Sequence, residues 1–136
     1  MKQRPNVILK FLEGNWTCED TLYISGKAPV INRYDETMAI KDKDTLMITA
    51  YGLKDTPITK DMIIAITDDN VTMRQGDFTA TGKIRGNRVV LVNNDFQSRD
   101  YEIRLYLMAD TYLYQMDTFE DGLIISAQTS YLKRKP

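Results

Sequence analysis

The sequence predicts an all-β protein, an up-and-down antiparallel barrel of about ten strands with a short N-terminal helix that plugs one end. Two observations lead to this prediction. Apolar and polar residues alternate with a period of two from Trp16 to Arg134, which is typical of strands with one buried face. The polar turns between these segments are too short for crossover helices, so successive strands are expected to run antiparallel.

The plug helix is expected before Gly14. Asn6 is a good N-cap residue at its start. The apolar stripe that follows consists of Val7, Ile8, Phe11 and Leu12. Gly14 then ends the helix, because glycine accepts backbone conformations that other residues avoid.

The strands follow the helix in order. They are expected at residues 16–23, 30–41, 45–53, 61–67, 71–74, 78–84, 89–92, 101–108, 112–119 and 123–133. The longest connections are the 25–29 loop, the 54–60 segment with Pro57 and a polar bend at 93–100. Residues 89–92 are apolar throughout, which predicts burial on both faces or cover from the helix. With no βαβ unit or internal repeat, we expect one domain over residues 1–136.

Composition excludes several classes of function. The formal net charge is −1, with acidic and basic residues interspersed, so no basic face for nucleic acid is expected. The N-terminal apolar run is too short for a secretory leader or a membrane span. A cytoplasmic location is therefore the default expectation.

Histidine is absent, and Cys18 is the lone cysteine. This excludes histidine-based catalytic triads and histidine-ligated metal or haem sites, and it leaves no intrachain disulfide. The acidic turn at residues 67–70 lacks the ligand spacing of a calcium loop. We expect no metal and no cofactor, and we interpret Cys18 as a small buried apolar residue.

The inner faces of the strands are rich in methionine and tyrosine, which suit a small apolar ligand. Methionine adapts its shape to irregular surfaces, and tyrosine adds a hydroxyl that can fix orientation. The candidate ligand-binding residues are Tyr34, Glu36, Met38, Met62, Ile64, Met73, Arg74, Tyr101, Tyr114, Met116 and Tyr131. The same residues could simply fill the barrel, although about ten strands make a barrel wider than an eight-stranded one.

Glu36 shares the parity of Tyr34 and Met38 in its strand. If that face is inward, the carboxylate must be paired or protonated, and Arg74 is a candidate partner. Arg104 has the opposite parity from its apolar neighbours and is expected to face solvent. Three hypotheses follow: a carrier, sensor or sequestering protein for a small hydrophobic molecule; an isomerase-type or cyclase-type enzyme that uses Glu36 with tyrosine or arginine; or an interaction module with a filled core.

The segment Gly14-Asn15-Trp16 opens the first strand. The indole of Trp16 is expected to seal the closed end of the barrel, under a cation from the last strand such as Lys133 or Arg134. With the preceding residues 11–13, this segment resembles the start of the calycin group: lipocalins, fatty-acid-binding proteins and nitrobindin-type small barrels. The resemblance covers about residues 7–134 and implies a ligand-binding β-barrel.

This sequence departs from each named relative. Nitrobindin-type haem binding uses a histidine, which this chain lacks, so haem binding is not implied. The connection at residues 24–29 is too short for the two-helix lid of fatty-acid-binding proteins. Avidin-like barrels share the Gly-x-Trp motif but use several tryptophans around their ligand, whereas Trp16 is the single tryptophan here.

Overall fold

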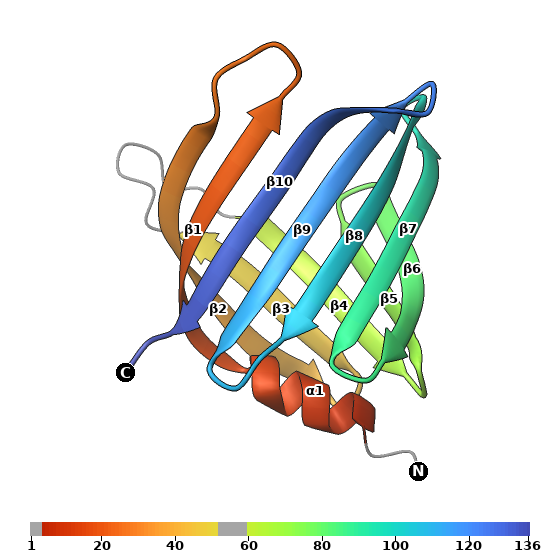
Figure 1. The fold of residues 1–136 in the computed structure, drawn as a ribbon. Helices are drawn as coiled ribbons and strands as arrows, with labels where there is room; N and C mark the ends of the chain where they lie inside the picture. The colour runs from red at the N-terminus through yellow and green to blue at the C-terminus, as the bar shows by residue number, and fades with distance from the viewer. Residues whose placement is uncertain (1–3, 52–59) are drawn as a thin grey trace.

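Ten antiparallel strands close into a barrel in the computed structural model, which describes residues 4–51 and 60–136 (Figure 1). The helix is α1 (Arg4–Leu12). The strands are β1 (Gly14–Ile24), β2 (Val30–Asp42), β3 (Thr45–Tyr51), β4 (Lys60–Thr67), β5 (Asn70–Gln75), β6 (Phe78–Arg85), β7 (Arg88–Phe96), β8 (Arg99–Leu107), β9 (Thr111–Glu120) and β10 (Leu123–Arg134). Each strand pairs with its neighbours in sequence, and β1 pairs with β10 to close the barrel. The predicted fold class is confirmed.

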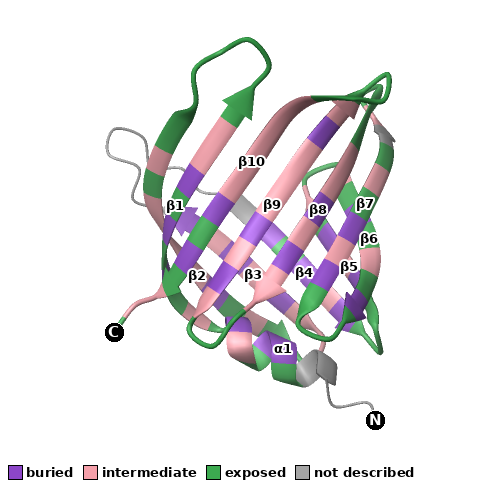
Figure 2. Ribbon diagram, viewed as in Figure 1, coloured by how far each residue is buried: buried purple, intermediate pink, exposed green. Residues whose placement is uncertain are grey.

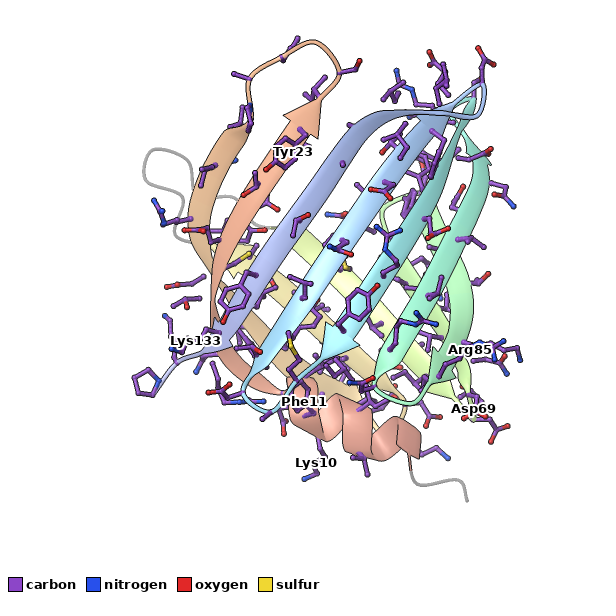
Figure 3. The ribbon with its side chains drawn as sticks, viewed as in Figure 1. Lys10, Phe11, Tyr23, Asp69, Arg85 and Lys133 are labelled. Atoms are coloured by element: carbon purple, nitrogen blue, oxygen red, sulfur yellow. The ribbon has the colours of Figure 1, made fainter. Side chains whose placement is uncertain are left out.

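Helix α1 lies across one end of the barrel, which we call the closed end (Figure 1). Its buried residues are Ile8, Leu9 and Leu12, while Val7 is 61% exposed. Figure 3 shows Lys10 pointing away from the barrel and Phe11 next to the strands. The predicted stripe was therefore wrong at Val7. The helix begins at Arg4, so Asn6 lies inside its first turn instead of capping it.

Burial along the strands follows the predicted period of two. In β1, Trp16, Cys18 and Asp20 are buried and the residues between them are exposed. Figure 2 shows the buried residues concentrated in the middle and towards α1, whereas the loop between β1 and β2 at the other end is exposed. The apolar core thus fills the closed end, and the barrel is less filled toward the opposite end.

Two local predictions were wrong. The polar bend at 93–100 is mostly strand, because β7 continues to Phe96 and β8 begins at Arg99. Gln97 and Ser98 make the tight turn between them, with φ of 53° and 65°. Residues 89–92 are not covered on both faces: Val89 and Leu91 face the core, while Val92 is 43% exposed.

Residues 52–59 are outside the described residues. They include most of the predicted 54–60 connection and the end of the predicted 45–53 strand. Strand β3 is described as far as Tyr51 and pairs with β4 through Lys60. Within the described ranges, no helix combines the length and apolar character needed to cross a membrane.

Candidate functional site

The barrel interior contains two adjoining spaces between the closed end and the opposite end. The narrow chamber, of about 20 Å³, is lined by Tyr34, Glu36, Ile48, Ala50, Met62, Tyr112, Tyr114, Gln128, Ser130 and Leu132. The wide chamber, of about 230 Å³, is lined by Met62, Met73, Gln75, Phe78, Phe96, Tyr101, Tyr114, Met116 and Gln128. Met62, Tyr114 and Gln128 line both. The narrow chamber has room for about one water molecule, so a ligand body would occupy the wide one.

Three aromatic rings form one wall of the wide chamber. The Phe78 and Phe96 ring centroids are 5.2 Å apart, and Phe78 and Tyr101 are 5.0 Å apart, both edge to face. These residues lie at the ends of β6, β7 and β8 farthest from α1. Mutual packing restricts their rotamers, so this wall is preorganised, whereas the thioethers of Met62, Met73 and Met116 are adaptable.

A buried carboxylate lies behind the polar wall of the narrow chamber. Asp20 of β1 is 6% exposed. Its Oδ1 accepts hydrogen bonds from the Ser130 hydroxyl at 2.5 Å and from Gln128 Nε2 at 2.8 Å, both from β10. A buried carboxylate requires such partners, and here they hold Ser130 and Gln128 in fixed positions beside the chamber.

Cys18 and Tyr34 form a second polar contact in the same region. They are paired across β1 and β2, and a side-chain hydrogen bond joins them. Burial raises the pKa of the Cys18 thiol to about 12, despite hydrogen bonds to Tyr34 and Ser130 that act in the opposite direction. Burial also raises the pKa of Tyr34. Both groups stay protonated at neutral pH.

Glu36 is half-buried and lines the narrow chamber beside two tyrosines. Burial raises the pKa of Tyr112 and of Tyr114, and the negative charge of Glu36 raises both further. The phenols are therefore neutral hydrogen-bonding groups next to an acidic side chain. No Lys or Arg is among the described residues that line either chamber.

The closed end of the barrel is sealed below the narrow chamber. Trp16 is 0% exposed, and its Nε1 donates a hydrogen bond to the Leu12 carbonyl at 2.8 Å. The Tyr112 ring packs edge-on against the indole, with 5.9 Å between centroids. The indole thus separates the chambers from α1.

The structure distributes the predicted ligand-binding residues among three environments. Those that line a chamber are Tyr34, Glu36, Met62, Met73, Tyr101, Tyr114 and Met116. Met38 and Ile64 also point inward, but each is 1% exposed and packed in the apolar core of the closed end. Neither Met38 nor Ile64 is among the described residues that line a chamber.

Arg74 and Tyr131 differ from the expectation, because both lie on the outer face. Arg74 is exposed, as its neighbour Met73 occupies the inward position. Tyr131 is 47% exposed between the buried Ser130 and Leu132. Arg74 is therefore not an internal partner for Glu36. Arg104 does face outward, where it pairs with Glu102 at 2.7 Å and with Asp117 at 3.0 Å.

Several residues of the site were not predicted from the sequence. They include Asp20, Phe78, Phe96, Gln128 and Ser130. A signal was present for Asp20, which shares the parity of Trp16 and Cys18 in β1. Within the described part of the chain, no group of three or more acidic or cysteine side chains could hold a metal ion.

No protein-family model matches the sequence, and no curated protein matches it. Several solved structures are similar in fold. The S-type phycobiliprotein lyase CPES from Guillardia theta has a TM-score of 0.76 at 10% identity, over 100% of this chain and 94% of that one. Rv2717c from M. tuberculosis has a TM-score of 0.64 at 13% identity, over 96% of each chain.

A third similar structure is EF1p2_mFAP2b bound to DFHBI, with a TM-score of 0.51 at 13% identity over 99% of this chain and 100% of that one. At such low identities the similarity establishes the fold alone. The comparisons therefore support the antiparallel β-barrel fold.

Proposed function

We propose that this protein binds a small, largely apolar molecule inside the barrel, as a carrier, sensor or sequestering protein. The observation that carries the proposal is the wide chamber of about 230 Å³, with its wall of thioethers and aromatic rings. Burial of apolar ligand surface against such a wall contributes roughly 25 cal/mol per Å². An interaction module with a filled core would not need this space.

The arrangement of polar groups supports the same proposal. Ligand sites are mostly apolar, with a few placed polar groups that fix orientation. Gln128 and Tyr114 line both chambers, so they stand where a ligand held in the wide chamber would meet the polar wall. One of the similar barrels was solved with the small molecule DFHBI bound, which is compatible with ligand binding in a barrel of this kind.

The proposal is tested by titration with N-phenyl-1-naphthylamine, a neutral dye that fluoresces in apolar surroundings. We expect saturable binding at about one site per chain. The Met62→Trp variant should weaken binding strongly, because Met62 lines both chambers and the added bulk would occupy them.

Ile63→Trp is the matched control, since Ile63 is the next residue of β4 and is 37% exposed on the outer face. It should leave dye binding unchanged, as should Arg74→Ala and Tyr131→Ala. Absence of saturable binding in the parent protein, or equal binding by the Met62→Trp and Ile63→Trp variants, would refute the proposal.

A further inference from the structure

We infer that the ligand of this barrel is built on a compact aromatic ring system and not on a long aliphatic chain. This inference rests on the proposed function and specifies the chemical class of its ligand. It follows from the inner limit and the size of the wide chamber, from the three rings in its wall and from the methionines on either side of those rings.

The wide chamber ends, in the direction of α1, where the narrow chamber begins. Met62, Tyr114 and Gln128 border both spaces, and the narrow chamber has room for about one water molecule. Below it, Trp16 and Leu132 are buried in the apolar core. A long chain would not pass this point, so its remaining methylene groups would stay in water, where they contribute no apolar burial.

The wide chamber is also small for a ligand site. The described residues enclose about 230 Å³, which is below the range of about 300–1,000 Å³ that is common for small-molecule pockets. A rigid ring system concentrates apolar surface in such a space, whereas a flexible chain loses conformational freedom about each bond that binding fixes. The volume therefore favours a compact, rigid ligand body.

The three rings of the chamber wall belong to neighbouring strands, with Phe78 on β6, Phe96 on β7 and Tyr101 on β8. The plane of Phe78 makes an angle of 83° with each of the other two rings, and Phe96 and Tyr101 are inclined at 68°. Each residue is only partly buried and lines the chamber. Rings at such steep angles offer both edges and faces to a further ring, and each such contact adds affinity beyond the burial of area.

Methionines lie on both sides of this aromatic wall. Met73 on β5 and Met62 on β4 follow the rings in one direction around the barrel, and Met116 on β9 follows them in the other. Strands β4 and β9 are opposite each other in the closed order of ten strands, so Met62 and Met116 reach the chamber from opposite sides. Thioethers make favourable contacts with aromatic rings, often at the ring edge. A saturated ligand would gain only apolar burial from the same side chains.

The test uses three neutral alcohols with the same number of carbon atoms: 2-naphthylmethanol, its saturated counterpart decahydro-2-naphthylmethanol, and the linear 1-undecanol. Each competes with N-phenyl-1-naphthylamine, and its affinity is divided by its octanol–water partition coefficient to remove the difference in hydrophobicity. We expect this normalised affinity to be at least about fivefold higher for 2-naphthylmethanol than for either saturated alcohol, since one ring–ring contact is worth about two- to tenfold in affinity.

Two variants locate the preference. Phe78→Leu and Phe96→Leu each remove a ring from the chamber wall and keep an apolar side chain. Each should lower the ratio of the affinities for 2-naphthylmethanol and its saturated counterpart at least about threefold relative to the parent protein, a comparison in which the hydrophobicities of the ligands cancel. Phe119→Leu is the matched control: Phe119 follows the buried, inward Thr118 in β9 and is paired with Asp100, the neighbour of Tyr101. It therefore faces outward at the same end of the barrel.

The outcomes separate the two proposals. If the dye and the alcohols bind but the normalised affinities are equal, or highest for 1-undecanol, this inference is wrong and the proposed function stands. An aromatic preference that both ring variants leave unchanged, or that Phe119→Leu reduces as much as they do, would also overturn the inference. If neither the dye nor any of the alcohols binds, the proposed function fails and the inference falls with it.

Discussion

The guanidinium carbon of Arg134 lies 4.3 Å from the centroid of the Trp16 ring. The same side chain donates hydrogen bonds to the carbonyls of Glu13, at 2.9 Å, and Phe11. One residue of the last strand thus joins the buried indole to the end of α1. This contact fixes the helix over the closed end and predicts a marked effect of substitution at either residue.

Arg134→Ala should lower the free energy of unfolding by about 2–4 kcal/mol, because it removes a cation–π contact and two charged hydrogen bonds. Arg134→Lys keeps the charge but loses the planar fork, so it should recover less than half of this loss. Urea denaturation measures both. Lys133→Ala, at the exposed neighbouring position, serves as control, and equal losses at the two positions would contradict the assigned role.

Trp16→Ala should lower the free energy of unfolding by about 3–5 kcal/mol, the usual range for truncating a large buried aromatic residue. Trp16→Phe should cost less, since it retains a ring but loses the hydrogen bond to the Leu12 carbonyl. Because Trp16 is the single tryptophan and is 0% exposed, its native emission should be blue-shifted. Strong quenching of that emission by iodide would show that the closed end is open to solvent.

Gly82→Ala should be strongly destabilising, by at least about 3 kcal/mol, because the backbones of β6 and β7 approach closely at this position. A Cβ atom at Gly82 would lie 1.7 Å from the Val90 carbonyl oxygen. Gly26→Ala is the comparison: its φ is +78°, and no atom lies within 4 Å of the added carbon. There we expect only backbone strain of about 1 kcal/mol. Chemical denaturation ranks the two, and equal effects would contradict the close approach.

Alkaline pH should destabilise the protein in part through Cys18. The thiol has a pKa of about 12 in the folded protein, against an ordinary value of 9.0. The folded state therefore binds the proton more tightly, so this contribution is complete below pH 9 and is lost as the pH rises from about 9 to about 12. The raised pKa values of Tyr34 and Tyr114 act with the same sign.

Urea denaturation between pH 7 and 10.5 measures this effect, with Cys18→Ala as the comparison. As the pH rises, the free energy of unfolding of the variant should fall less than that of the parent protein. Part of the pH dependence should remain in the variant, because it retains Tyr34 and Tyr114 with their raised pKa values. Identical pH dependence in the two proteins would show that Cys18 does not contribute. At pH 8, the native thiol should also react with a disulfide reagent only after unfolding, because the thiolate is the reactive form.

The candidate site was only partly predictable because some of its inward side chains are polar, whereas the alternation pattern assigns apolar side chains to the inward face. In β10, the inward residues Gln128 and Ser130 are polar, whereas the outward Tyr131 is aromatic. A rule that places apolar residues inside therefore assigns this strand backwards. Asp20 was overlooked for the same reason: its cost of burial is offset by hydrogen bonds from β10, a strand far away in sequence.

The sequence by itself determined the closed antiparallel barrel, because a period of two and short turns leave neighbouring strands little choice of partner. It also indicated the sealed end, through Trp16 and a cation from the last strand. The tertiary structure decided which inward residues border open space. Alternation specifies the face of a strand but not the depth along the barrel, and depth separates Met38, packed near α1, from Met62, which lines both chambers.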